Sequence, residues 1–363
     1  MINIFRLFIV KSMDILRRGG YCTEIFPLAF ACDSSAANLR HELMQHHRII
    51  ELEAFPERDN EKKRVFEAVK MSVCILFAQK SAAQGQFTLR IHHDRYVDTS
   101  NQKVVLHPLT IRTIDEKHCT IPLLTPDDLS ILEHLYRVGA PLRNVGHCYT
   151  GEIDLSLDKA LLTDDSKKAV MVKGAILDRY QIRKAMSQGE IMFLDAKKYL
   201  ANNRGERSLH HKNQRIVLQG ITGVNEKTRL KMTLVKPGTF CANSVNYVLI
   251  SNPQIVPEYL LGVLNSKIMN FTFSLTSTNS NVNGYEVDNL PIVIADRRIQ
   301  ESVAKLVTRI LEAKDRQEGV STDKLEGEVE QIVSTLYRLN DEQIARIANH
   351  GQGHAIANVT DEP

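Results

Sequence analysis

The stretch YCTEIFPLAFACDSSAANLRHELMQHHRIIELEAF, residues 21–55, decides the fold of the first part of the chain. It predicts a strand over 21–26, a helix over 36–45 and a second strand over 49–55. Two strands joined by one helix are the repeating unit of an open α/β sheet. The stretch therefore predicts an α/β fold.

The flanking residues extend this pattern on both sides. Apolar residues at helical spacing predict a helix over 2–16, before the first strand. Residues 72–79 are nearly all apolar, as in a strand buried on both faces, and a strand over 87–92 can pair beside it. Because the chain opens on a helix that should follow an earlier strand, we expect an incomplete sheet. An unpaired edge strand in such a half-sheet would favour aggregation.

The rest of the chain predicts an α+β domain followed by C-terminal helices. Apolar positions over 257–275 indicate one long helix, and two amphipathic helices near the end of the chain indicate a hairpin. The expected boundaries are 1–95 for a partial Rossmann-like half-domain, 96–123 for a linker, 124–295 for the α+β domain, 296–348 for the helical hairpin and 349–363 for a polar tail.

Composition excludes several classes of protein. No apolar run of the 363 residues approaches the roughly 18 residues of a membrane span. The six cysteines are scattered without a CxxC pair, which predicts reduced core thiols in a cytoplasmic protein. There is no P-loop and no HExxH motif. The adjacent histidine pairs lack neighbours that would complete a metal site, so we expect no metal ligand and assign these histidines to the surface or to DNA.

Charge is distributed unevenly along the chain. The formal net charge is only +3, but residues 167–236 hold 16 Lys and Arg against 5 Asp and Glu. Residues 296–363 hold 9 against 13. A strongly basic segment indicates either a polyanion-binding surface or a solvated face. The stretch MVKGAILDRYQIRK, residues 171–184, lies in this segment and fits both interpretations.

Several stretches together resemble a known family. RRGGYCTEIFPLAFACDSSAANLRHEL (17–43) and IIELEAFPERDNEKKRVFEAVKMSVCILFAQK (49–80) resemble the C-terminal half of the catalytic domain of adenine-specific (N6) DNA methyltransferases. The similar proteins are combined restriction–modification proteins of type IIG (Eco57I-like). The sequences that resemble successive parts of their target-recognition domain and closing helix are MVKGAILDRYQI, RIVLQGIT, FCANSVNYVLI, YLLGVLNSKIMNFTF and LEGEVEQIVSTLYRLNDEQI.

The resemblance implies sequence-specific recognition of double-stranded DNA within a restriction–modification system. In the family, S-adenosylmethionine is the methyl donor for adenine N6. The family's glycine-rich cofactor loop and its (N/D)PP(Y/F) adenine clamp have no counterpart in this sequence. We therefore expect no cofactor, no catalytic residue and no methyl transfer from this chain alone. The alternatives are a split enzyme whose missing N-terminal half is a separate chain, a protein-docking specificity or assembly subunit, and an unstable gene remnant.

Candidate site residues follow from the resemblance and from side-chain chemistry. Phe66 matches the family position whose ring stacks on the flipped target base, although it could instead fill the core beside Val65 and Val69. Tyr180 is expected to pack on the domain core. Arg pairs with guanine, Asn and Gln pair with adenine, and Lys and Arg grip phosphates. The candidate DNA contacts are Lys173, Arg179, Arg183, Lys184, Arg215, Gln219, Arg229, Lys231, Asn243 and Lys267.

Overall fold

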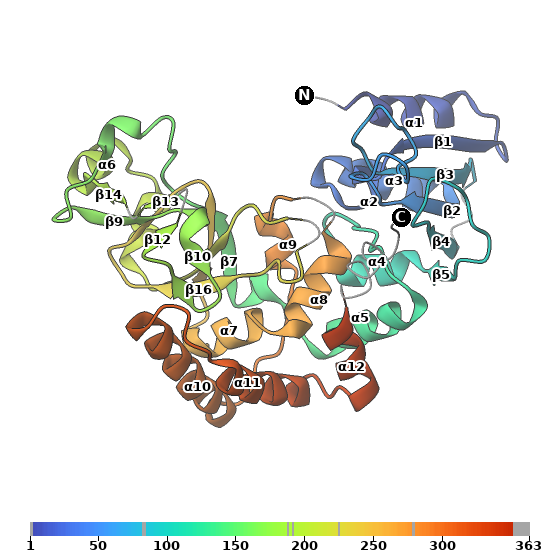
Figure 1. The fold of residues 1–363 in the computed structure, drawn as a ribbon. Coiled ribbons are helices and arrows are strands. Elements are labelled where there is room, and N and C mark those ends of the chain that lie inside the picture. The colour runs from blue at the N-terminus through green and yellow to red at the C-terminus, as the bar shows by residue number, and fades with distance from the viewer. Residues whose placement is uncertain are drawn as a thin grey trace, which may run out of the picture. The chain divides into compact units, whose positions relative to one another are not determined.

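The computed structural model describes residues 3–81, 85–186, 189–190, 192–223, 226–277 and 280–350. The chain forms two compact units (Figure 1), one of residues 1–137 with 275–279 and one of residues 138–274 with 280–363. The predicted linker 96–123 belongs to the first unit. The C-terminal helices belong to the second unit, together with the predicted α+β domain. Most of the predicted polar tail lies outside the described residues.

The first unit is built on a mixed five-stranded sheet of order β1-β3-β2-β4-β5. β3 runs antiparallel to both β1 and β2, β2 and β4 are parallel, and β4 and β5 are antiparallel. The predicted pairing of the strand at 87–92 with the strand at 72–79 is wrong, because β1 and β2 already occupy both edges of β3. The strands are β1(Tyr21–Pro27), β2(Arg48–Phe55), β3(Val73–Gln79), β4(Phe87–Ile91) and β5(Lys103–Leu106).

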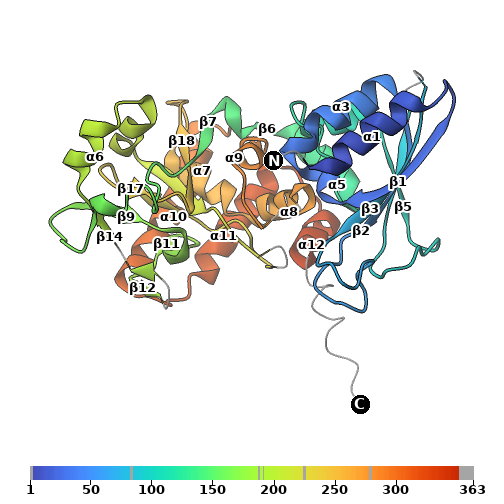
Figure 2. The ribbon, with the colours of Figure 1, turned by 90° about the horizontal axis from the view of Figure 1, so that it is seen from above.

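Helices of the first unit cover one face of this sheet at the β1 end. Phe26 of β1 stacks on Phe5 of α1, with ring centroids 5.3 Å apart, and meets Phe30 of α2 edge-on at 5.1 Å. Figures 1 and 2 show α1 running over β1. Helix α5 begins as predicted, since Thr125 and Asp128 cap its first turn reciprocally. The helices are α1(Ile4–Ile15), α2(Ala29–Cys32), η1(Ser34–Ala36), α3(Ala37–His46), α4(Pro108–Ile114) and α5(Pro126–Val138).

The second unit contains two four-stranded sheets, of order β16-β15-β18-β7 and β17-β9-β14-β8. Three pairs of two-residue strands accompany them: β6(Ala140–Pro141) with β19(Pro291–Ile292), β10(Leu177–Asp178) with β11(Gln181–Ile182), and β12(Ala185–Met186) with β13(Gly189–Glu190). The strands of the two sheets are β7(Gly146–Thr150), β8(Leu162–Thr163), β9(Ala169–Val172), β14(Met192–Leu194), β15(Arg215–Gln219), β16(Met232–Val235), β17(Phe240–Cys241) and β18(Val245–Ile250).

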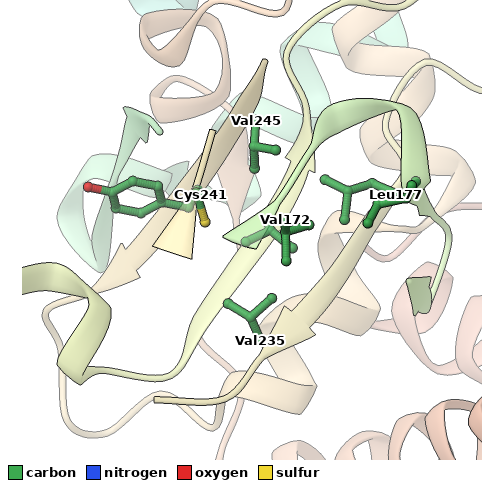
Figure 3. Packing of buried hydrophobic residues seen from close by; sticks show 8 residues of the cluster. Val172, Leu177, Val235, Cys241 and Val245 are labelled. Carbon is green, nitrogen blue, oxygen red and sulfur yellow. The ribbon is translucent and has the colours of Figure 1, made fainter. Parts of the chain in front are cut away.

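Apolar side chains from both sheets form a common core. Val172 of β9 and Cys241 of β17 pack with Val235 and Val245 of the other sheet (Figure 3). A second cluster lies beneath α6(Ala196–Asn202) and contains Met171, Leu194, Tyr199 and Phe240. Because the two clusters share strands β9 and β17, the β17-β9-β14-β8 sheet is fixed to the β16-β15-β18-β7 sheet. The 3₁₀ turns of this region are η2(Leu142–Asn144), η3(Lys159–Leu161), η4(Gly174–Ile176) and η5(Glu206–Lys212).

Helices complete the second unit, and two predictions about them are wrong. The single helix expected over 257–275 is broken, because the buried Asn265 bonds through its amide to both the N–H and the carbonyl of Met232. The C-terminal hairpin has a third helix, since Asn340 and Gln343 form a capping box that starts it. The helices are α7(Pro257–Leu264), α8(Lys267–Thr276), α9(Gly284–Asp288), α10(Arg297–Arg316), α11(Asp323–Leu336) and α12(Asp341–Asn349).

All six cysteines are free thiols, five of them buried, as the sequence predicted. No helix in the described part of the chain is long and apolar enough to cross a membrane. The fold is thus a mixed α/β structure.

Candidate nucleic-acid interface

The stretch MVKGAILDRYQIRK forms a tight hairpin whose turn is not on the surface. β10 pairs with β11, and Arg179 and Tyr180 form the two-residue loop between them. Tyr180 is only 2% exposed and has a positive φ of 59°, and its N–H donates to the carbonyl of Met232 at 2.8 Å. The prediction that Tyr180 packs on the domain core is confirmed.

The C-terminal helices hold this turn in place. The amide of Gln181 donates to the carbonyl of Lys314 at 3.0 Å, and Lys314 Nζ donates to the carbonyl of Arg179 at 3.2 Å. Arg179 and Lys314 each form an ion pair with Glu326, at 2.9 and 3.0 Å. Burial works to raise the pKa of Glu326, but Arg179 and its other partners hold that pKa below its ordinary value. These contacts therefore anchor the hairpin turn to helices α10 and α11.

Arg179 and Lys267 lie in an acidic environment. Together with Glu326 and Glu330 they line a cleft of about 790 Å³ along α11. The backbone N–H of Lys267 donates to Glu330 at 2.8 Å. Carboxylates at this distance oppose the approach of a phosphate. These carboxylates therefore make Arg179 and Lys267 poor candidates for phosphate contacts.

Two of the predicted DNA contacts lie in the interior, which corrects their assignment. Arg215 is 0% exposed and binds both carboxylate oxygens of Glu152 at 3.1 Å, and its guanidinium lies 4.4 Å from the ring centroid of Tyr247. Arg229 is 2% exposed and lies over the ring of Phe273, and burial lowers the pKa of its guanidinium. Both side chains are engaged by the protein itself and cannot reach DNA in this fold.

Three further candidates are engaged at the surface. Arg183 pairs with Asp178, and Lys231 pairs with Glu226. The amide of Gln219 donates to the carbonyl of Leu177 at 3.0 Å. Exposed ion pairs contribute little to stability and can exchange partners, so a phosphate could still compete for Arg183 and Lys231.

The remaining candidates are accessible. Lys184 and Asn243 are exposed, and Lys173 is partly exposed. Hydrogen bonds join the segments that carry Asn243 and Lys173, and with two neighbouring segments they form a surface that we call the Asn243 platform. It consists of residues 173–175, 220–222, 242–244 and 280–282.

Backbone contacts hold the Asn243 turn tightly. The N–H of Asn243 donates to the carbonyl of Ile153 at 2.7 Å. The N–H of Gly174 donates to the Ser244 hydroxyl at 3.0 Å. A Cβ at Gly174 would lie 2.4 Å from the carbonyl oxygen of Ser244, and one at Gly151 would lie 2.0 Å from that of Ala242. Only glycine permits these approaches, so the turn that carries Asn243 is built on a close-packed backbone.

Two more segments join the platform through the backbone. Gly220 donates its N–H to the carbonyl of Ser244 at 2.9 Å and accepts from Val282 at 2.9 Å. Ile221 bridges to Asn281, and both side chains are exposed. Asn281 is not among the predicted DNA contacts, although it lies in a polar loop rich in Asn and Ser. Its place on the platform depends on the fold.

The side chain of Asn243 lies near the carboxylate of Asp154, whose pKa is lowered mainly by hydrogen bonds from the backbone N–H groups of Leu157 and Ser156. An exposed Asn amide offers a carbonyl oxygen and two N–H groups to a ligand.

Exposed basic residues gather around the β17-β9-β14-β8 sheet of the second unit. Lys168 and Lys198 both approach Asp195, at the start of α6. Among the described residues no ion pair involves the other exposed cations of this region, which are Lys159, Lys167, Lys197, Arg204, Arg207, Lys212 and Lys236. The exposed cations of the basic segment therefore lie mainly around this sheet, and not on the β10–β11 hairpin.

Phe66 lies in the first unit, on the loop between β2 and β3, and is 42% exposed. It is therefore not a core residue. Arg95 donates to the carbonyl of Lys62 at 2.7 Å and also binds Glu67, so it ties this loop to the one that follows β4. An exposed ring on a braced loop is available to stack on a flat ligand.

The described residues contain no group of three or more His, Cys, Asp or Glu that could hold a metal ion. His210 donates to or accepts from the hydroxyl of Tyr247 at 2.8 Å. His211 stacks on Phe240 with ring centroids 4.5 Å apart. Both are buried, so the prediction that these two histidines face the surface or DNA is wrong.

Residues 170–292 match the model of a family described as the TaqI-like C-terminal specificity domain. The matched segment contains the whole Asn243 platform. No curated protein matches the chain.

Solved structures of restriction–modification enzymes are similar to the chain. The type IIL enzyme MmeI in complex with DNA is similar over 97% of this chain and 51% of that chain, with a TM-score of 0.53 and 10% identity. The type IIG restriction endonuclease BpuSI is similar over 92% and 48%, with a TM-score of 0.38 and 10% identity. The chain thus spans about half the length of MmeI and shares its fold over that length. The predicted resemblance to restriction–modification proteins with a target-recognition domain is confirmed.

Proposed function

We propose that this chain recognises a specific sequence in double-stranded DNA, as part of an adenine-specific DNA methyltransferase of a restriction–modification system. The observation that carries the proposal is the match of residues 170–292 to a specificity domain, with the Asn243 platform inside the matched segment. A rigid backbone that presents amide groups fits this task, because base readout needs donors and acceptors fixed in position.

In this proposal Asn243 reads a base edge and exposed lysines hold the backbone. An Asn amide can bind adenine N6 and N7 together, and Asn281 offers a second amide on the same platform. Lys173, on the platform, and Lys184 would contact phosphates, together with the exposed lysines around the β17-β9-β14-β8 sheet. Arg215 and Arg229 have no part in binding, because both are buried.

The first unit supplies part of the methyltransferase in this proposal. β1 and β2 are both antiparallel to β3 and so parallel to each other, and the segment between them forms helices. This arrangement supports a Rossmann-like half-domain. Phe66 would stack on the flipped adenine.

The described residues do not fit S-adenosylmethionine. A cofactor of this kind needs a glycine-rich turn after a strand and an acidic side chain for its ribose. Gly19 and Gly20 precede β1 instead. Glu53 of β2 is 4% exposed and already binds Arg90 at 2.9 Å and His92 at 2.6 Å. Methyl transfer to adenine N6 therefore requires a polypeptide that supplies the cofactor loop and the adenine clamp.

Selection from a pool of random DNA duplexes at increasing salt tests the DNA-recognition proposal. We expect enrichment of one short sequence that contains adenine, with affinity that falls steeply as salt rises. Asn243→Ala should reduce discrimination against a substituted adenine by about 10- to 100-fold, which corresponds to about 1–3 kcal/mol for one bidentate contact. Asn213→Ala, at an exposed asparagine outside the platform, is the matched control.

The outcomes separate the alternatives. Uniform binding that weakens with salt, without an enriched sequence, would leave only a phosphate-gripping surface and would contradict sequence recognition. The absence of binding at low salt would contradict the proposal altogether and would favour a subunit that docks protein.

A further inference from the structure

One large apolar side chain faces solvent on the otherwise polar Asn243 platform. Ile221 is 64% exposed, while the next residue, Thr222, is only 2% exposed. Val282, on the neighbouring segment of the platform, is also buried. Single exposed apolar side chains are common on protein surfaces, so exposure alone does not mark a site. The position of Ile221 among groups that suit base recognition is the informative feature.

Hydrogen bonds on both sides of Ile221 hold its backbone in place. The residue before it, Gly220, is bonded through both its N–H and its carbonyl to neighbouring segments. The N–H of the residue after it, Thr222, donates to the carbonyl of Ser280 at 2.8 Å. Ile221 itself bridges to Asn281 in antiparallel orientation. Since branching at Cβ also restricts the rotamers of isoleucine, its side chain is a rigid apolar projection.

The pairing of β15 with β18 places Ile221 beside Asn243. Gly220 follows the end of β15, and Ser244 precedes the start of β18. The N–H of Gly220 donates to the carbonyl of Ser244 at 2.9 Å, which continues the antiparallel register by one residue. The next facing positions are Ile221 and Asn243, and both side chains are exposed. Facing residues of an antiparallel pair are neighbours on the same side of the sheet.

An amide that reads adenine leaves the other half of the base pair unread. Asn binds N6 and N7 of adenine in the major groove, where the paired thymine presents its O4 and its 5-methyl group. The methyl group is apolar, and it is the only difference between thymine and uracil. An apolar side chain beside the amide can therefore bury this methyl group while the amide binds the adenine.

We propose that Ile221 contacts the 5-methyl group of a thymine, either in the base pair whose adenine Asn243 binds or in the base pair next to it. This inference rests on the proposed recognition of DNA by the Asn243 platform. It names the chemical group of DNA that the apolar part of the platform recognises, and it makes Ile221 a specificity-determining residue.

Insertion between base pairs is the other use that proteins make of an apolar side chain on DNA. Such wedges typically enter from the minor groove and kink the duplex. Adenine N6 and N7 are reached from the major groove. Because Ile221 lies beside the amide that reads these atoms, it faces the major groove and the thymine methyl group.

Replacement of thymine by uracil in the recognised DNA tests the proposal. Each thymine of the sequence enriched from random duplexes is replaced in turn, which removes one methyl group and keeps base pairing. For the full chain we expect about fourfold weaker binding at one thymine, which corresponds to about 0.8 kcal/mol for one buried carbon group. This thymine should lie in the base pair at which Asn243→Ala loses discrimination, or in the next one.

Variants of Ile221 connect this loss to the side chain. Ile221→Ala should bind the thymine and uracil duplexes equally, while Ile221→Val should keep part of the difference. Because the side chain is exposed, both variants should unfold near the wild-type temperature. The matched control is Ile294→Ala, at an isoleucine of the same unit that is 47% exposed and lies outside the platform. This control should keep the full fourfold difference.

The outcomes distinguish a failure of the methyl contact from a failure of DNA recognition. An enriched sequence in which no uracil substitution weakens binding would overturn the methyl contact alone. The same holds if the loss persists in Ile221→Ala, or if it occurs more than one base pair from the adenine that Asn243 reads. If selection enriches no sequence, the proposed function fails and the methyl contact fails with it.

Discussion

Replacement of Arg215 by methionine tests the most consequential correction that the structure makes. The sequence predicts a DNA contact, whereas the structure places Arg215 in a buried ion pair. The side chains of Arg215 and Glu152 are 0% and 1% exposed and share two hydrogen bonds of 3.1 Å. Methionine has a similar length but leaves Glu152 as an uncompensated buried carboxylate. Removal of one partner of such a pair costs about 3–5 kcal/mol.

This cost is large for a folded unit of this size. For a unit of residues 138–274 with 280–363, each kcal/mol lowers the unfolding temperature by about 2–4 °C. We therefore expect Arg215→Met to lower the unfolding temperature of the second unit by about 6–20 °C, measured by thermal denaturation. The double variant Glu152→Gln with Arg215→Met should recover part of the loss, because it leaves no buried charge unpaired.

The control is Lys212→Met, which removes the same charge from an exposed position three residues earlier. Its unfolding temperature should stay near that of the wild type. For Arg215→Met, we also expect the salt dependence of DNA binding to match that of the wild type. A decrease in the salt slope by about one, together with an unchanged unfolding temperature, would show that Arg215 contacts a phosphate and would refute the buried pair.

Two further predictions concern the platform and the acidic cleft. Gly174→Ala should weaken DNA discrimination as Asn243→Ala does, and it should also lower the unfolding temperature. The reason is that its Cβ would lie 2.4 Å from the carbonyl oxygen of Ser244. Unchanged DNA selection and unchanged stability would contradict the close packing. Burial raises the pKa of Glu330, so its carboxylate form costs stability, and that cost grows as pH rises above the ordinary carboxyl value of about 4.3. Glu330→Gln keeps an oxygen that can accept from the Lys267 N–H. Its unfolding temperature should therefore exceed that of the wild type at pH 8 and match it at pH 4. A difference in unfolding temperature that does not grow with pH would contradict the cost of the buried carboxylate.

Much of the local structure could be predicted from the sequence. The predicted strands at 21–26, 49–55 and 72–79 agree with the structure within one residue at every boundary, because apolar runs between turn residues leave few alternatives. The order of those strands in the sheet was harder to predict from the sequence. Nothing in the segment that became β4 specifies whether it pairs with β3 or with β2, since pairing depends on which edge remains available.

Helix breaks were missed for a related reason. The apolar stripe over 257–275 continues through Asn265, and only the contact of this side chain with Met232 ends α7 there. Helical periodicity reports which face is apolar. It does not report a buried polar side chain whose partner lies on another strand.

The sequence by itself determined the main strands and helices of the first 91 residues, where basic residues concentrate and which family the chain resembles. The tertiary structure alone decided which of those basic residues face solvent. Arg215 pairs with Glu152, 63 residues away, and Arg179 pairs with Glu326 in the acidic C-terminal region. A positive charge looks the same in the sequence whether water, phosphate or a distant carboxylate surrounds it. The long-range packing of the chain brings the partner close, and so it separates structural arginines from those available to DNA.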